Sequence, residues 1–296
     1  MSNPVFTGAA VAVITPFTPD LKKIDYDKFD EIIEYQIAHK TDAVVVAGTT
    51  GEAPTLSVPE HIELVNHCVK TVGGRVPVIA SCGSNDTFYC VGLANECEKA
   101  GADALLMVTP YYNKTSQSGI IEHYNYIADR VNTPIILYHI PGRTGMTMTP
   151  ETIYQISKHK NIVGIKEASG NISSIGQTAA FCSKDFEIYS GNDDQIVPIM
   201  SLGGKGVISV LSHIVPEVAH DIAKSYLEGK TRKATDLQLK YMDLCTALFC
   251  DVNPIPVKAA MNMMGFNVGR CRMPLGTLSE ENEKRIRKAL KNHGLI

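Results

Sequence analysis

Residues 134–169, PIILYHIPGRTGMTMTPETIYQISKHKNIVGIKEAS, combine two short apolar runs with a helix start between them. The runs PIILYHIP at 134–141 and IVGIKEAS at 162–169 show no alternation of polar and apolar residues. This pattern is typical of strands covered on both faces, as in a parallel sheet. Between them, Thr149 is a suitable helix cap and Pro150 suits the first helical position. The stretch therefore predicts a strand, a helix and a second, parallel strand.

The same unit repeats along most of the chain. Further apolar runs are AAVAVITPF at 9–17, DAVVVAG at 42–48, PVIASCG at 77–83, ADALLMVTP at 102–110, FEIYSGND at 186–193 and GVISVLS at 206–212. Helix signals separate them: a capping box at Ser57 and Glu60, and a helix that Asn85 would cap and Gly101 would end. The glycine fingerprint of a doubly wound sheet follows none of the strands. Eight repeats predict an α/β fold, a (β/α)8 TIM barrel, which typically takes about 250 residues.

The end of the chain has helical patterning without further strand signals. Helix starts are expected at Val215-Pro216, at Asn253-Pro254 and at Ser279-Glu280. We therefore expect a barrel over residues 1–225, which holds the active site, and a C-terminal helical extension over residues 226–296.

Composition limits the class of protein. The 296 residues are 44% hydrophobic and 20% charged, as in a folded globular protein, and the net charge of -3 gives no pull toward nucleic acid or an anionic membrane. No signal peptide and no apolar run of about 20 residues occur. The eight cysteines form no C-x-x-C pair, which predicts reduced thiols in a cytoplasmic protein without disulfides or zinc. Small molecules and further copies of the chain are the expected partners.

Lys166 is the residue most suggestive of chemistry. It lies within an apolar strand, where a lysine is either paired with a carboxylate or kept neutral and functional. Burial favours the uncharged amine, which can attack a carbonyl group and form a Schiff base. The other lysine in apolar surroundings is Lys258, within PIPVKAAMNMM, and its position on a helix allows the amine to reach water. We therefore expect Lys258 to be structural.

Other polar residues follow the strands, at the barrel end where active sites lie. The GTTG turn at 48–51 offers N–H groups and hydroxyls to a small carboxylate, although it would also serve as an ordinary turn. Tyr138 is placed to move protons, or simply to pack. Arg143 offers a bidentate fork to a second carboxylate. Asp193 and Asp194 are expected to cap the next helix rather than to bind a metal.

Taken together, GTTGE, PYYNK, YHIPGRTG, GIKEAS and SGND, in this order and spacing, resemble the dihydrodipicolinate synthase/N-acetylneuraminate lyase family of pyruvate-dependent aldolases and synthases. The resemblance covers almost the whole chain. It implies a lyase that condenses pyruvate with L-aspartate-4-semialdehyde to 4-hydroxy-tetrahydrodipicolinate, on the route to diaminopimelate and lysine. It also implies a covalent imine with pyruvate and no metal or organic cofactor.

The resemblance also assigns roles to individual residues. Lys166 would form the imine, and Thr49 and Thr50 would hold the pyruvate carboxylate. Thr50, Tyr138 and Tyr112 would relay protons, with Tyr112 contributed by the neighbouring subunit of a tight dimer. Most relatives are tetramers built as dimers of dimers and some are dimers, and the sequence alone does not separate the two assemblies.

The remaining substrate contacts follow from the same resemblance. Arg143 would bind the carboxylate of the semialdehyde, and the backbone near Gly191 and Ile208 would line the pocket. Arg143 and the Thr49-Thr50 pair favour the synthase over N-acetylneuraminate or keto-deoxy-gluconate lyases, whose partner aldehydes are neutral polyols. Those pyruvate aldolases stay open as alternatives, as does a barrel without catalytic activity.

One departure from the family pattern concerns regulation. Members that lysine inhibits have a histidine and a glutamate where this chain has Val58 and Tyr89, although Asn85 and Tyr111 match. A lysine ammonium would lose its carboxylate partner. We therefore expect weak or no feedback inhibition by lysine.

Overall fold

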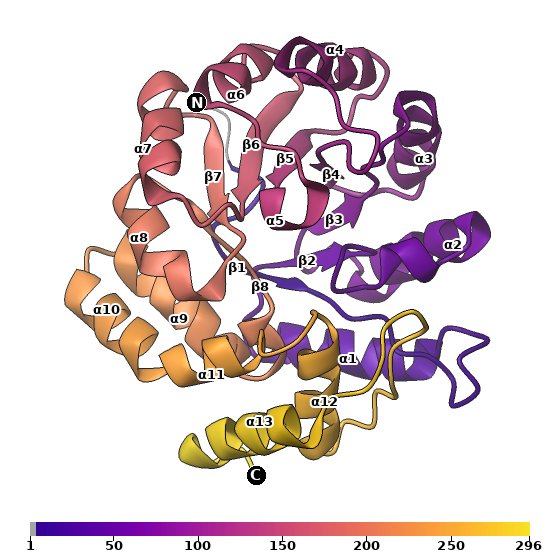
Figure 1. The fold of residues 1–296 in the computed structure, drawn as a ribbon, viewed down its shortest axis with the longest axis vertical. Helices are drawn as coiled ribbons and strands as arrows, with labels where there is room; N and C mark the ends of the chain where they lie inside the picture. The colour runs from indigo at the N-terminus through magenta and orange to yellow at the C-terminus, as the bar shows by residue number, and fades with distance from the viewer. Residues whose placement is uncertain (1–3) are drawn as a thin grey trace.

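In a computed structural model, which describes residues 4–296, eight parallel strands close into a barrel (Figure 1). The strands pair in chain order and β1 pairs with β8, which confirms the predicted TIM barrel. They are β1 Gly8–Ala12, β2 Ala43–Val46, β3 Val78–Ser81, β4 Ala104–Val108, β5 Ile135–His139, β6 Ile162–Glu167, β7 Glu187–Ser190 and β8 Gly206–Ser209. Each coincides with one of the eight apolar runs, except that β1 begins one residue before its run. Residues 1–3 of the predicted barrel segment lie outside the described residues.

Side chains fill the amino end of the barrel. Phe6, which precedes β1, stacks on Tyr189 of β7 with the ring centroids 4.3 Å apart. The Tyr189 oxygen lies 2.5 Å from a Glu187 carboxylate oxygen and 2.9 Å from the Phe6 carbonyl, which share its one proton, and it accepts a hydrogen bond from the Phe6 N–H. The polar atoms of this plug therefore have partners. Because side chains fill the amino end, the open space of the barrel lies at its carboxyl end.

Helices surround the strands. They are α1 Tyr26–Ala38, α2 Val58–Val72, α3 Thr87–Lys99, α4 Gln117–Ala128, α6 Pro150–Ile156, α7 Ile172–Phe181, α8 Ile196–Ser201 and α9 Pro216–Leu227, and the short α5 Pro141–Thr144 follows β5. The capping box at Ser57 and the cap at Thr149 are confirmed. The expected cap at Asn85 is wrong: the Asp86 carboxylate accepts the first free N–H groups of α3, because it is one residue closer to them.

The end of the chain is helical. It contains α10 Thr231–Lys240, α11 Met242–Ala247, α12 Ile255–Met263 and α13 Glu280–Asn292. Helix α9 packs against β1 and ends at Leu227, two residues past the expected end of the barrel segment at residue 225, and α13 packs on α11 and α12. In Figure 1, α11 and α12 lie beside the barrel end that carries α5. Of the helices in residues 4–296, none combines the length and the apolar character needed to cross a bilayer.

Candidate active site

The turn after β2 presents free backbone donors. Ala47 and Glu52, at either side of the GTTG segment, adopt positive φ angles of 54° and 57°, and the Thr15 hydroxyl donates to the Gly51 carbonyl at 2.6 Å. Neither the N–H of Thr49 nor that of Thr50 is taken up by a hydrogen bond within residues 4–296. A backbone turned in this way offers adjacent donors to an anion. The segment therefore has the geometry that a small carboxylate requires.

Tyr138 and Lys166 face each other across two neighbouring strands. They are register partners on β5 and β6, and the Lys166 amine lies 4.3 Å from the centroid of the Tyr138 ring. Lys166 is only 7% exposed. The lysines that form ion pairs within residues 4–296 are others: Lys28, Lys40, Lys99, Lys230 and Lys258. A structural ion pair therefore does not explain the burial of Lys166.

Gly191 and Ile208 lie beside this pair. A Cβ atom on Gly191 would come within 3.1 Å of Lys166 Cε and 2.7 Å of the Ala168 side chain, so only glycine leaves room for the lysine. Ile208 of β8 is buried in the same interior cluster as Tyr138. Both residues therefore bound the space around the Lys166 side chain.

Asp193 has a different role from the one that its sequence position suggested. The expectation that it caps the following helix is wrong, because no side chain caps either helical segment that follows β7. Its buried carboxylate instead accepts hydrogen bonds at the turn after β8, from Ser209 Oγ, Val210 N and Leu211 N. Burial raises the pKa of Asp193, while these hydrogen bonds and the positive charge of Lys166 lower it. Asp193 is thus a buried acidic group close enough to Lys166 to feel its charge.

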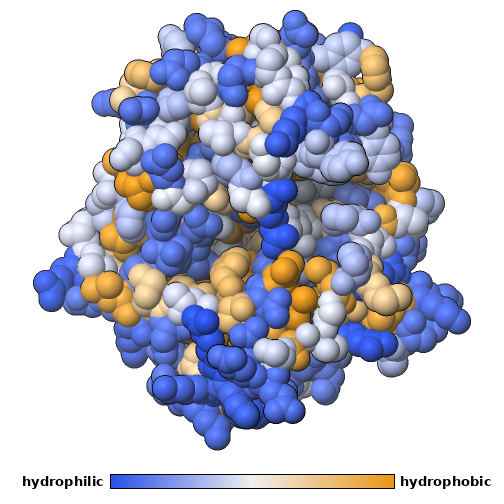
Figure 2. Space-filling view, viewed as in Figure 1, coloured by the Kyte–Doolittle hydropathy of each residue, from blue (hydrophilic) through white to orange (hydrophobic). Residues whose placement is uncertain are grey.

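A pocket of about 460 Å³ opens at this end of the barrel. Thr49, Tyr138 and Arg143 line it together, and Tyr89 and Tyr111 form part of its wall. Arg143 is on α5, and its exposed guanidinium donates to a backbone carbonyl across the pocket mouth. Figure 2 shows this face hollowed near its centre, with apolar side chains along the edge nearest α12.

The other predicted residues lie outside the lining of this pocket. Thr50 is buried beside it, and Lys166, Gly191 and Ile208 lie deeper in the barrel. Tyr112 is 91% exposed and has a positive φ of 69°, a backbone conformation that is uncommon for a large side chain. Within one copy of the chain, the site is therefore assembled from β2, β5, β6 and the residues that follow them, without Tyr112.

The sequence model of the Dihydrodipicolinate synthetase family matches residues 5–293. The chain belongs to this family. A relative from Clostridium acetobutylicum, named 4-hydroxy-tetrahydrodipicolinate synthase 1, is 52% identical over 292 residues, which are 99% of each protein.

Solved structures of the synthetase family have the same fold. A dihydrodipicolinate synthase from Cyanidioschyzon merolae with lysine bound is 38% identical, with a TM-score of 0.96 over 99% of this chain and 100% of that one. A monomeric variant of dihydrodipicolinate synthase is 40% identical, with a TM-score of 0.96 over 99% of this chain and 98% of that one. The resemblance noted in the sequence is confirmed, as is the expectation that the chain is a lyase of this family. The barrel without catalytic activity is thereby set aside.

Lys258 is structural in this member of the synthetase family, but the expected contact with water is wrong. It is 1% exposed and forms a buried ion pair with Glu52, the last residue of the GTTGE motif. Burial lowers the pKa of Lys258, and Glu52 raises it. The reason for the error is that Lys258 lies on the side of α12 that faces the barrel.

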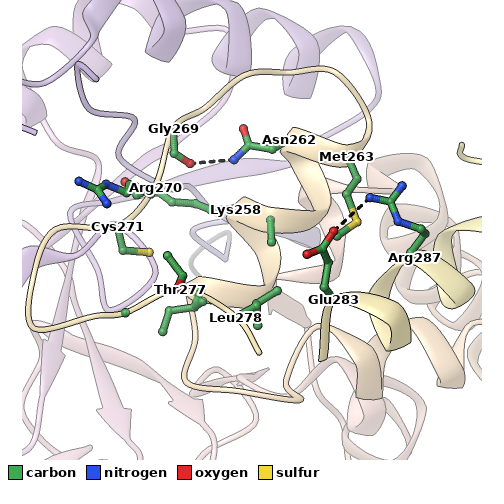
Figure 3. Close-up of a pocket in the computed structure, with 13 residues that line it drawn as sticks. Lys258, Asn262, Met263, Gly269, Arg270, Cys271, Thr277, Leu278, Glu283 and Arg287 are labelled. Carbon is green, nitrogen blue, oxygen red and sulfur yellow. Dashed lines mark hydrogen bonds and ion pairs between the residues drawn. The ribbon is translucent and has the colours of Figure 1, made fainter. Parts of the chain in front are cut away.

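Lys258 also lines a second pocket, of about 420 Å³ (Figure 3). Asn262 and Cys271 are at one side of it, and the Glu283–Arg287 ion pair is at the other. It shares no lining residue with the pocket at Tyr138. Within residues 4–296, no group of three or more histidine, cysteine, aspartate or glutamate side chains is arranged to hold a metal ion.

Two features of the site have no clear sequence signal. Asn253, which the sequence marks only as a helix start, donates from its side-chain amide to Thr50 Oγ1 at 2.9 Å. His139 and Glu167 form a buried pair at 2.9 Å on the strands that carry Tyr138 and Lys166. The neighbouring Met148 N–H donates to His139 Nε2, which leaves Nδ1 to donate to Glu167. This pair holds β5 and β6 together behind the site.

Proposed function

We propose that this protein condenses pyruvate with L-aspartate-4-semialdehyde to give 4-hydroxy-tetrahydrodipicolinate, for diaminopimelate and lysine biosynthesis. The observation that carries the proposal is the buried Lys166 amine, without an ion-pair partner in residues 4–296 and next to the Tyr138 ring. The relative from C. acetobutylicum carries the name of this activity. A reducing, cytoplasmic location agrees with the cysteines, all eight of which are free within the described chain.

In this mechanism the Lys166 amine attacks the ketone carbon of pyruvate, and water leaves to give an imine. The imine withdraws electrons, so a proton can leave the methyl carbon and an enamine forms. The enamine carbon then attacks the aldehyde. The amino group of the former semialdehyde next attacks the imine carbon and displaces the Lys166 amine, which closes the ring, releases the product and restores Lys166. These steps need no metal or organic cofactor. The free N–H groups of Thr49 and Thr50 would hold the pyruvate carboxylate, and Gly191 and Ile208 would bound it.

Protons must enter and leave this buried site. We assign their transfer to Tyr138, Thr50 and Tyr112, with Tyr112 supplied by a second copy of the chain. The support is that Tyr112 projects to the surface of its own copy, at 91% exposure and on a strained backbone. A homotetramer built as a dimer of dimers is the assembly that we propose.

Arg143 determines the second substrate in this proposal. Its guanidinium lies at the pocket mouth, where it can form a bidentate pair with the semialdehyde carboxylate. A neutral polyol aldehyde, the partner in N-acetylneuraminate or keto-deoxy-gluconate lyases, would leave this charge without a counter-ion. The position of Arg143 therefore favours the synthase over its aldolase relatives.

Substitution of Arg143 tests the proposed function. The wild-type protein is expected to turn over pyruvate with L-aspartate-4-semialdehyde and to leave N-acetylneuraminate uncleaved. Arg143→Ala should lower kcat/KM for the semialdehyde by about 10²-fold, since a charged hydrogen-bonded pair contributes about 1.5–3 kcal/mol. The KM for pyruvate should change little. The control is Arg232→Ala, which removes a 91% exposed arginine on α10. An equal loss of kcat/KM for the semialdehyde and for pyruvate would contradict the role assigned to Arg143. Cleavage of N-acetylneuraminate without condensation of pyruvate and the semialdehyde would favour the aldolase.

We also propose that lysine inhibits this enzyme weakly or not at all. Val58 and Tyr89 are 43% and 44% exposed, and Tyr89 borders the pocket. Neither side chain can form an ion pair with a lysine ammonium. One solved relative has lysine bound.

A lysine titration of the wild-type enzyme is expected to show no inhibition at physiological concentrations. The Val58→His/Tyr89→Glu variant provides the matched comparison. A new ion pair of about 1.5–3 kcal/mol should increase lysine affinity by about 10- to 100-fold. Strong inhibition of the wild-type enzyme would contradict the proposal.

A further inference from the structure

Asn253 connects the C-terminal extension to two residues of the candidate site. It directly precedes α12 and is 6% exposed. Its side-chain Nδ2 donates to Thr50 Oγ1 at 2.9 Å, and its backbone carbonyl accepts from Arg143 Nη2 at 3.0 Å. The side chain and the backbone of one residue therefore contact two different functional groups.

The bond from Asn253 determines which way the Thr50 hydroxyl can donate. A hydroxyl group has one proton and two acceptor lone pairs, and an amide nitrogen can only donate. Nδ2 therefore occupies a lone pair of Thr50 Oγ1 and leaves the hydroxyl proton for another acceptor. Within residues 4–296 this proton has no acceptor. It is therefore available for a proton-transfer step.

The Asn253 amide has one atom without a partner in the described chain. Its Oδ1 atom is buried and accepts no hydrogen bond from any atom of residues 4–296. A buried acceptor without a partner costs about 1–3 kcal/mol. This cost falls on the residue whose amide donates to the side chain of Thr50. A nearby asparagine, Asn262, has both its amide nitrogen and its oxygen paired.

We infer that Asn253 is a positioning residue for proton transfer, and this inference rests on the proposed function. In the transfer step, Thr50 donates its proton to the Tyr138 oxygen and receives one from Tyr112, so the number of protons on Thr50 is unchanged. The step needs Thr50 to donate in one direction and accept from the other. Asn253 enforces this direction from outside the barrel without touching the substrate.

A double-mutant cycle of Asn253 and Thr50 tests the inference. Asn253→Asp keeps the size of the side chain but replaces the donor by a carboxylate oxygen, which accepts the Thr50 proton and reverses the bond. Because general acid–base transfer contributes about 10²–10⁴-fold, kcat should fall by about 10²-fold. The KM for pyruvate and the yield of the borohydride-trapped imine should be unchanged. In a Thr50→Val background, Asn253→Asp should have no further effect on kcat.

The control variant and the possible outcomes distinguish a failure of this inference from a failure of the proposed function. Asn262→Asp, on α12 and with its side chain bonded to residues 268 and 269, should leave kcat unchanged. Equal losses from Asn253→Asp in the wild-type and Thr50→Val backgrounds would overturn the inference and leave the proposed function intact. A parallel loss of imine formation would also overturn it, because it would indicate a general disturbance of the site. If the wild-type protein fails to turn over the two substrates, the proposed function is wrong and the inference fails with it.

Discussion

Lys166→Ala is expected to remove turnover almost completely, by about 10⁴-fold or more, because losses of this size follow the removal of a catalytic nucleophile. Treatment of the wild-type protein with pyruvate and borohydride should add one reduced pyruvate per chain, and peptide mapping should place it on Lys166. The variant should form no adduct. Its fold should be retained, since Lys166 has no ion pair within residues 4–296 to lose.

Two comparisons make this experiment specific. Lys160→Ala removes an exposed lysine just before β6 and should leave both the adduct and turnover unchanged. Lys258 is also buried, but its amine is engaged by Glu52 and should remain unmodified. A folded wild-type protein that forms no adduct at saturating pyruvate, or forms it on Lys258, would show that Lys166 is not the nucleophile.

Lys258→Met is expected to lower the free energy of unfolding more than any other substitution proposed for this protein. The side chain of Glu52 would remain buried without its counter-ion, although the Arg272 N–H still donates to it at 2.8 Å. Breaking a buried pair by removing one partner typically costs about 3–5 kcal/mol. The loss should be measured as the change in the urea unfolding midpoint at fixed protein concentration, because assembly also contributes to stability.

Neutral replacement of both partners separates charge from packing. Glu52→Gln/Lys258→Met should recover most of the loss, because a buried pair replaced by neutral groups of similar volume often leaves stability unchanged. Arg232→Met breaks a surface pair on α10 and should shift the midpoint very little. If Lys258→Met alone shifted the urea unfolding midpoint as little as Arg232→Met, Glu52 and Lys258 would not form the buried pair described above.

The barrel could be predicted because its strands are buried on both faces. All eight apolar runs contain a strand, and the closed order follows from repeated strand–helix units. Most strands are shorter than their runs: β4 ends at Val108, for example, whereas its run continues to Pro110. The cap of α3 was misplaced by one residue, because Asn85 and Asp86 are both good caps and only the geometry selects between them.

The candidate site was predictable where it lies on or directly after strands. Tyr138 and Lys166 are brought together by the parallel register of β5 and β6, which the order of the runs already implies. Asn253 and the Glu52–Lys258 pair depend instead on where α12 lies against the barrel. No pattern in the sequence encodes that placement, because a helix with apolar residues on several sides does not show which side faces the barrel. The contacts between segments far apart in the chain were therefore missed.

The ties between the extension and the turn after β2 also set the order in which the site is completed during synthesis. Glu52 precedes its partner Lys258 by 206 residues, and Thr50 precedes Asn253 by 203. At about 5–20 residues per second, a ribosome needs roughly 10–40 s to add that length of chain. During this interval the emerging barrel contains an acidic group without its counter-ion and a threonine without its donor. A nascent chain therefore acquires its complete site only after the ribosome has added residue 258.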